Sequence, residues 1–175
     1  ACSSSVVNFS NNPVEIIESE YPLMIERYGY LPDTGGPGKF RGGLALERQY
    51  RFLEAEGTLQ LRTDRRHHLP YGLAGGRPGT PSRNVLNPGP DSRELPAKCT
   101  LTVRHGDVYR HELAGAGGWG DPFERDPAHV LRDVMEEKIS VAYARREYGV
   151  AIDERTWTIV PEDTARLRAA ARIAR

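Results

Sequence analysis

The chain has 175 residues and equal numbers of acidic and basic side chains, 24 of each, so its formal net charge at pH 7 is zero. This length suits one domain or slightly more, and a neutral balance without a basic stripe argues against nucleic acid as the main partner. No apolar run approaches the roughly 20 residues that a membrane-spanning helix needs. Only two cysteines are present, Cys2 and Cys99, which excludes a disulfide framework and favours a reducing cytoplasm. The chain opens at Ala1 without an initiator methionine, which is typical of a processed product or of the later part of a longer polypeptide.

The first two thirds of the sequence predicts a β-rich body. An irregular lead over residues 1–11 precedes Asn12-Pro13, a pair that begins helices because Asn caps the first turn and Pro needs no amide partner there. Tyr21-Pro22 ends this short helix. Alternating apolar residues beyond it predict strands over residues 23–31, 44–52, 59–63 and 99–103.

A tight turn and a helical tail complete the expected order. The sequence Arg-His-Gly-Asp at 104–107 predicts a turn that folds residues 108–113 back on the preceding strand as a hairpin. The helices that follow are marked by caps at Asp126 and Ser140, by a terminating Gly149, and by a last start near Pro161.

The expected fold class is α+β. About five or six antiparallel or mixed strands are predicted between residues 20 and 113, followed by a small helical tail. The predicted domain boundaries are a lead at 1–11, a β-rich region at 12–122 and a helical tail at 123–175.

Four stretches rich in glycine and proline interrupt these elements, at residues 31–43, 64–79, 115–122 and 124–127. Glycine takes positive φ freely and proline fixes φ, so these stretches are expected to hold one shape and to bring backbone amides close to a partner.

Gly38-Lys39 suggests a phosphate-binding loop. That motif requires a glycine and a hydroxyl residue where this chain has Asp33 and Phe40, so we expect a structural turn instead.

The densest polar cluster is Asp-Arg-Arg-His-His at residues 64–68. An aspartate can hold an arginine bidentately, and the fixed arginine can then bind a carboxylate or a phosphate. Asp64, Arg65 and His68 are therefore the candidate catalytic residues. Three other interpretations remain open: a structural Asp–Arg brace, a substrate or subunit contact, and a metal bound by one histidine or by both. Neighbouring histidines of an extended chain point to opposite faces, which argues against the last of these.

The remaining reactive side chains are isolated. His105, His111 and His129 have no second ligand at metal-binding spacing and are expected at the surface or in packing. Cys99 alternates with apolar residues, which favours a buried, inert thiol. Glu26-Arg27 favours an ion pair across the sheet over acid–base catalysis.

Several motifs follow one another in a distinctive order: Asn12–Glu15, Tyr21-Pro22, Glu26–Tyr28, Asp33–Gly43, Asp64-Arg65, Pro70–Gly76, Lys98, Gly106-Asp107, Gly117–Pro122 and Tyr148–Val150. This order closely resembles the C-terminal part of the hydantoinase B/5-oxoprolinase family, over about residues 8–152. Departures are mild: Tyr71 stands where the family usually has Trp, and Ala116 interrupts a run of glycines.

The resemblance implies a component of an ATP-dependent amidohydrolase, which phosphorylates the oxygen of a cyclic amide such as a hydantoin or 5-oxoproline before hydrolysis. The implied partners are a hydantoinase A-type ATPase subunit, which carries ATP and Mg²⁺, and the N-terminal half of a hydantoinase B-type subunit, which carries a divalent metal. This chain alone is expected to be inactive and to bind no cofactor. A biotin-independent, ATP-dependent ketone carboxylase is the alternative, and a structural module that braces the subunits is a second one.

Overall fold

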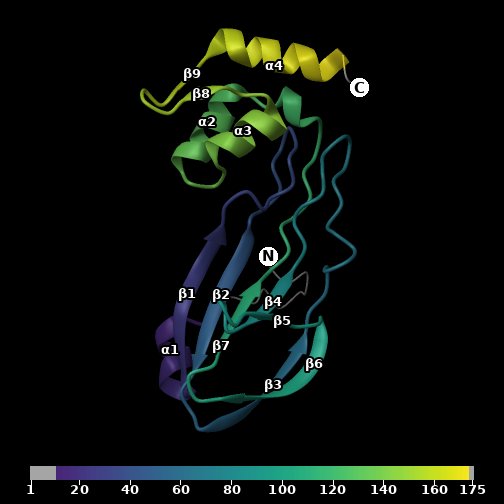
Figure 1. Ribbon diagram of the computed structural model, residues 1–175. Coiled ribbons are helices and arrows are strands. Elements are labelled where there is room, and N and C mark those ends of the chain that lie inside the picture. Colours follow the sequence, from purple (N-terminus) through teal and green to yellow (C-terminus); the bar gives the residue numbers. More distant parts are fainter. Residues whose placement is uncertain (1–10, 174–175) are drawn as a thin grey trace. The chain divides into compact units, whose positions relative to one another are not determined.

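The computed structural model describes residues 11–173, which form two units of three chain segments each (Figure 1). Among the described residues, unit 1 takes 11–29, 46–68 and 81–113, and unit 2 takes 30–45, 69–80 and 114–173. Antiparallel sheets make up the N-terminal body and helices lie mainly in the C-terminal part, so the predicted α+β class is confirmed. Cys2 and the predicted lead, apart from Asn11, lie outside the described residues.

Unit 1 holds a short helix and most of the strands. The elements are α1 (Val14–Glu20), β1 (Leu23–Leu31), β2 (Ala45–Phe52), β3 (Glu56–Arg62), β4 (Arg83–Leu86), β5 (Arg93–Glu94), β6 (Lys98–Arg104) and β7 (Val108–Glu112). Five strands pair in the order β1-β2-β7-β4-β5, while β3 and β6 form a separate antiparallel pair. They enclose a core cluster of Leu61, Leu86, Leu95, Val103 and Tyr109.

A buried polar side chain lies next to this core. Asn84 is 1% exposed; its side-chain oxygen accepts a hydrogen bond from the Tyr109 hydroxyl at 2.8 Å, and its amide donates to Thr63 Oγ1 at 2.8 Å. Burial raises the pKa of the Tyr109 phenol, so it remains a donor at neutral pH. The chain is thereby fixed at Thr63, directly before the polar cluster at residues 64–68.

Two predictions for unit 1 are wrong. The turn at 104–107 exists, with the Asp107 carboxylate accepting the Arg104 N–H at 2.8 Å, but it makes no hairpin. Instead β6 pairs with β3, and β7 pairs with β2 and β4, so the turn connects two sheets. Helix α1 has Pro13 rather than Asn12 at its N-cap position, and no side chain makes an N-cap hydrogen bond there. Strands β4 and β5 lie in a stretch for which the sequence predicted none, because each is too short to show an alternation.

Unit 2 ends in three α-helices, as predicted, with a 3₁₀ turn and a small hairpin: η1 (Pro122–Glu124), α2 (Pro127–Met135), α3 (Val141–Tyr148), β8 (Ile152–Asp153), β9 (Thr158–Ile159) and α4 (Pro161–Ile173). The predicted caps are confirmed, because Asp126 accepts the Ala128 N–H at 2.8 Å and Ser140 accepts the Tyr143 N–H at 3.0 Å. Gly149 ends α3 with φ of 60°. None of the helices within residues 11–173 combines the length and the apolar character that crossing a membrane requires.

Three glycine-rich segments of unit 2, residues 34–43, 70–80 and 114–120, contain no extended strand or helix but are hydrogen-bonded to one another; we call them the glycine bundle. Backbone hydrogen bonds join each segment to both others, as between the Gly36 N–H and the Ala116 carbonyl at 2.8 Å. The bundle thus satisfies many of its own peptide groups, as irregular backbone must when it is buried.

Close approach explains the glycine content of the bundle. A Cβ would lie less than 3.0 Å from a backbone atom elsewhere in the bundle at ten positions: Gly35, Gly36, Gly38, Gly42, Gly72, Gly76, Gly79, Gly115, Gly117 and Gly118. These stretches hold one shape, as expected from their composition. Many of their backbone amides, however, donate to carbonyls of neighbouring segments of the bundle. The sequence-based expectation that these amides face a binding partner is therefore wrong.

Candidate functional site

The predicted catalytic residues lie in a loop of unit 1 that follows β3. Ser82 holds two carbonyls of this loop: its N–H donates to Arg65 O at 3.1 Å and its hydroxyl donates to Asp64 O. Arg65 has φ of 62°, in the left-handed region that residues with a side chain rarely adopt. A conformation of this kind costs about 1–3 kcal/mol and persists where the surroundings impose it. The loop backbone is therefore fixed.

The side chains of this loop do not form the predicted brace. Asp64, Arg65 and His68 are exposed, and no ion pair joins Asp64 to Arg65 among the residues that the structure describes. The braced arginine is Arg66, which pairs with Glu94 at 2.8 Å and also donates to a backbone carbonyl. Within residues 11–173, no three His, Cys, Asp or Glu side chains are grouped to hold a metal ion. The loop thus presents Asp64, Arg65 and His68 to solvent on a fixed backbone.

The Glu26-Arg27 pair behaves as predicted. Glu26 accepts a hydrogen bond from Gln49 at 2.6 Å and pairs with Arg51, and Arg27 lies 3.6 Å from Glu47. The hydrogen bond from Gln49, followed by the contact with Arg51, holds the pKa of Glu26 below its ordinary value against the opposing effect of burial. These residues stabilise the β1–β2 pairing, and nothing about them indicates catalysis.

The isolated cysteine and histidines lie in packing or at the surface, as expected, with His105 and His129 exposed. Cys99 is half-buried against the unit 1 core, so the expected buried thiol is only partly enclosed. His111 stacks on Tyr109, with ring centroids 6.2 Å apart, and burial together with the charge of Arg48 lowers the pKa of His111. The His105 ring nitrogen Nδ1 lies 2.8 Å from a backbone carbonyl. None of these contacts groups the residues with a second metal ligand within the described part of the chain.

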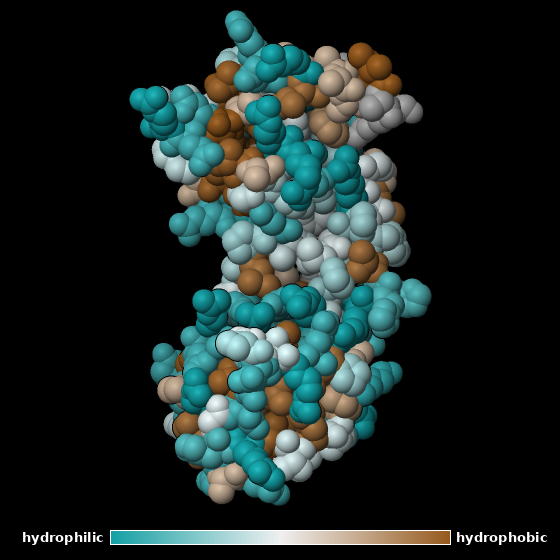
Figure 2. All heavy atoms as spheres, viewed as in Figure 1, coloured by the Kyte–Doolittle hydropathy of each residue, from teal (hydrophilic) through white to brown (hydrophobic). Residues whose placement is uncertain are grey.

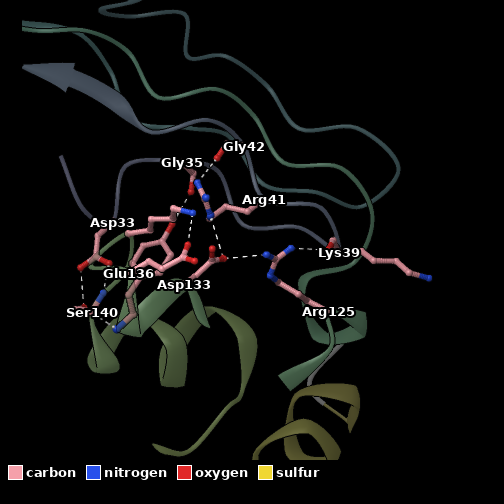
Figure 3. A network of polar contacts seen from close by, with 11 residues as sticks. Asp33, Gly35, Lys39, Arg41, Gly42, Arg125, Asp133, Glu136 and Ser140 are labelled. Atoms are coloured by element: carbon pink, nitrogen blue, oxygen red, sulfur yellow. Dashed lines mark hydrogen bonds and ion pairs between the residues drawn. The ribbon is translucent and has the colours of Figure 1, made fainter. Parts of the chain in front are cut away.

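A buried ionic network in unit 2 was not predicted at all (Figure 3). Asp133 on α2 is 5% exposed, and its Oδ2 accepts hydrogen bonds from Arg41 Nε at 3.1 Å and from an Arg125 terminal nitrogen at 2.9 Å. Arg41 also donates to the Gly42 carbonyl at 2.7 Å, and Arg125 donates to the Lys39 carbonyl at 2.9 Å. One carboxylate therefore fixes the first segment of the glycine bundle to α2.

A second set of contacts fixes the start of the bundle to α3. The Ser140 N–H and hydroxyl each donate to the Asp33 carboxylate at 2.7 Å, as Figure 3 shows. The buried Tyr143 hydroxyl donates to the Gly35 carbonyl at 3.1 Å. The glycine bundle is consequently held by side chains as well as by its own backbone.

A cavity of about 470 Å³ opens beside this network, lined by Tyr30, Arg41, Gly43, Leu44, Glu136, Glu137 and Lys138. Its charged lining groups include Lys138 and Glu136, which pair with each other. The guanidinium of Arg41 is already bound to Asp133, and the lining includes no nucleophile beside a base, so the cavity lacks a catalytic arrangement.

One sequence signal could have revealed the network. Asp133 lies between Val130 and Val134, which are buried on the apolar face of α2. A carboxylate on such a face needs a charged or hydrogen-bonding partner. The identity of that partner could not be read from spacing, because Arg41 is 92 residues away in the chain.

The loop at 35–39 is a structural turn, as expected. The N–H groups of Gly36 and Lys39 donate to carbonyls of residues 114–120. The Lys39 ammonium pairs with Glu124 at 3.3 Å. The groups that a phosphate loop would direct at a phosphate are engaged within unit 2.

Comparison with known proteins identifies relatives that are much longer than this chain. The family model described as hydantoinase B/oxoprolinase matches residues 1–122. A putative D-/L-hydantoinase subunit of Pseudomonas sp. (strain NS671) is 35% identical over 88% of this chain and 26% of its own length. The structure of ATP-dependent caprolactamase from Pseudomonas jessenii aligns with a TM-score of 0.81 and 30% identity, over 90% of this chain and 28% of that one. Nucleotide-free acetone carboxylase aligns with a TM-score of 0.81 and 23% identity, over 93% of this chain and 26% of the carboxylase chain. The chain spans about a quarter of the length of two of the curated relatives it matches.

Proposed function

Because the chain belongs to the hydantoinase B/oxoprolinase family, we propose that it works as one part of an ATP-dependent enzyme that opens cyclic amides. The observation that carries this proposal is the similarity of most of the chain to a putative hydantoinase subunit at 35% identity, with the caprolactamase structure as further support. Since the chain corresponds to only about a quarter of these relatives, the activity belongs to an assembly.

The chemistry divides between the parts of that assembly. An amide carbonyl is a weak electrophile, and transfer of the γ-phosphoryl group from ATP to its oxygen, with release of ADP, activates the carbon for attack by water. The adduct expels the ring nitrogen, which takes up a proton, and a second water hydrolyses the resulting acyl phosphate to a carboxylate and free phosphate. In this proposal, ATP and Mg²⁺ bind to a hydantoinase A-type ATPase subunit, and a divalent metal binds to the remainder of the hydantoinase B-type subunit. The contribution of this chain, in this proposal, is positioning and charge.

Arg65 is the residue of this chain that we place at the reaction cavity. Its backbone is fixed by Ser82, and its exposed guanidinium has no ion-pair partner among the described residues. A guanidinium without an ion-pair partner on a fixed backbone suits an anionic or phosphorylated species because its planar fork binds two oxygens at once. Asp64 and His68 are its polar neighbours on the same loop.

Replacing Arg65 by lysine tests this placement. We expect Arg65→Lys to lower turnover of the assembled enzyme at least ~10-fold, about 1.4 kcal/mol in the transition state, because lysine keeps the charge but loses the fork. Gel filtration should show an intact complex. Arg62→Lys, at an exposed position of β3, serves as the matched control and should leave turnover unchanged. Normal turnover of Arg65→Lys would remove the loop from the reaction cavity.

A ketone carboxylase is the second candidate, favoured by the fold match to acetone carboxylase, which equals the match to caprolactamase in TM-score. The sequence identity to acetone carboxylase is 23%, lower than the 30% to caprolactamase, so the hydrolase remains the first candidate. The third candidate, a module that only braces subunits, is favoured by the internal hydrogen bonding of the glycine bundle.

The substrates separate these candidates. The complex is isolated from the native cells through an affinity tag on this chain, and ATP hydrolysis is measured with hydantoin, 5-oxoproline and caprolactam, and with acetone or acetophenone plus bicarbonate. We expect a cyclic amide to stimulate ATP hydrolysis and to be opened. Stimulation by a ketone alone would establish the carboxylase, and a chain that purifies without any ATPase would contradict both enzymes.

A further inference from the structure

An exposed apolar patch lies on the glycine bundle of unit 2. Its members are Phe40, Tyr71, Leu73 and Trp119, which are 61%, 71%, 58% and 50% exposed; we call them the aromatic patch. The rings of Phe40 and Trp119 are in contact, with centroids 5.6 Å apart, and a backbone bridge places Leu73 beside Trp119. Hydrophobic residues reach the surface in small groups among hydrophilic ones on the face drawn in Figure 2. The largest apolar patch on a protein surface is often functional, so this group of exposed side chains is a candidate binding surface.

The backbone beneath the patch is rigid. Phe40 and Trp119 exchange both backbone hydrogen bonds, each at 2.9 Å, and the Leu73 N–H donates to a carbonyl of the bundle at 2.9 Å. A Cβ at Gly38 would lie 2.6 Å from the Trp119 nitrogen, so the segments cannot be packed any closer. A preorganised apolar surface loses little conformational entropy when it is covered, which is how a binding surface differs from a loosely exposed loop.

We propose that the aromatic patch docks onto the part of the hydantoinase B-type polypeptide that lies outside the region matched by this chain. This inference rests on the proposed function, in which the chain is one part of a larger subunit. The chain covers only 26–28% of two matched relatives, so about three quarters of each relative lies outside the matched region and could provide the facing surface. The facing surface should be apolar, because the patch offers aromatic faces and a leucine rather than charges.

The size of the patch favours this occupant over a second copy of the chain. At roughly 200 Å² for each large side chain, four residues that are half to three-quarters exposed offer roughly 500 Å². Covered by an equal surface, they bury roughly 1,000 Å², which lies in the range of domain interfaces within one polypeptide. Stable complexes of separate proteins typically bury about 1,600 Å². A patch of this size suits neighbouring parts of one subunit.

Footprinting and cross-linking of the native complex test the proposal. Hydroxyl-radical oxidation, measured by mass spectrometry, is compared between the isolated chain and the complex isolated from native cells. We expect Trp119 and Phe40 to be protected several-fold in the complex. Trp157, a tryptophan of similar exposure (48%) on the β8–β9 hairpin, is the internal control and should change less. Amine cross-links from Lys39, next to Phe40, should reach peptides of the remaining hydantoinase B-type polypeptide.

The matched variants are Trp119→Gln and Trp157→Gln. Trp119→Gln should weaken association with that polypeptide roughly 30-fold, the effect of a central aromatic contact, while Trp157→Gln should not. Equal oxidation of Trp119 in both samples, or equal association of both variants, would overturn the proposal. Lys39 cross-links to a second copy of the chain or to the ATPase subunit would overturn it as well. ATP-dependent turnover is a separate readout, so a docked but inactive complex would count against the proposed function alone.

Discussion

Replacing Gly42 by alanine, or replacing any other of the ten closely packed glycines of the bundle, is expected to destabilise unit 2 strongly. The new Cβ would lie 2.0 Å from the Ala116 carbonyl oxygen and 2.6 Å from its carbon. That carbonyl cannot retreat, because it accepts the Gly36 N–H at 2.8 Å while the Ala116 N–H donates to Gly43 at 2.9 Å. We expect a loss of about 4 kcal/mol or more, a large part of the 5–15 kcal/mol that stabilises a typical domain.

The neighbouring residue provides the control. A Cβ at Gly43 would lie 3.9 Å from the Ala116 Cβ, an ordinary contact, and Gly43 is exposed. Urea unfolding of Gly42→Ala and Gly43→Ala, followed by circular dichroism, should give a greatly lowered midpoint for the first and a stability within about 0.5 kcal/mol of wild type for the second. Similar midpoints for the two variants would mean that the segments are not packed as closely as the structure has them.

The sequence could predict that the glycine stretches are rigid, but not what makes them so. Composition distinguishes a shaped loop from a flexible linker, and Gly149 and the caps Asp126 and Ser140 have local signals that suffice to place helix ends. The bundle depends on contacts between segments separated by up to about 80 residues, such as Gly36 with Ala116. No local pattern encodes such a pairing. The false hairpin at 104–107 has the same cause, because a turn motif does not specify which strand the next one joins.

For the candidate site, too, the sequence could predict which neighbouring residues share a loop, but not the distant residues that contact them. Asp64, Arg65 and His68 share a loop, as their adjacency requires, and the tie to Ser82 that fixes the loop lies 17 residues beyond Arg65. Arg66 rather than Arg65 is braced, since its partner Glu94 lies on the small strand β5 that the sequence did not reveal. The role of Arg65 in the reaction stays a prediction. The sequence does not predict the aromatic patch, because its four members lie in three separate glycine-rich stretches and come together only in the folded bundle.

Removal of the Asp133 carboxylate is the second change with a large expected effect. The side chains of Asp133, Arg41 and Arg125 are only 7%, 14% and 13% exposed, so two guanidinium groups rely on one buried anion. Asp133→Ala leaves both cations without it, and breaking a buried pair in this way typically costs about 3–5 kcal/mol. Asp133→Asn should fall between alanine and wild type, because it keeps an acceptor but loses the charge.

A neutral replacement of the whole network separates charge from packing. The triple variant Asp133→Leu with Arg41→Met and Arg125→Met should recover most of the stability lost in Asp133→Ala, since no buried charge is left unpaired. Urea unfolding of wild type, Asp133→Ala and the triple variant measures how much of the lost stability is recovered. Phe40 lies between Lys39 and Arg41, whose positions the network fixes, so Asp133→Ala should also reduce the protection of Phe40 in the native complex, even under conditions where the chain remains folded. If Asp133→Ala is as stable as wild type, the glycine bundle alone positions the aromatic patch, and the buried ions contribute nothing to it.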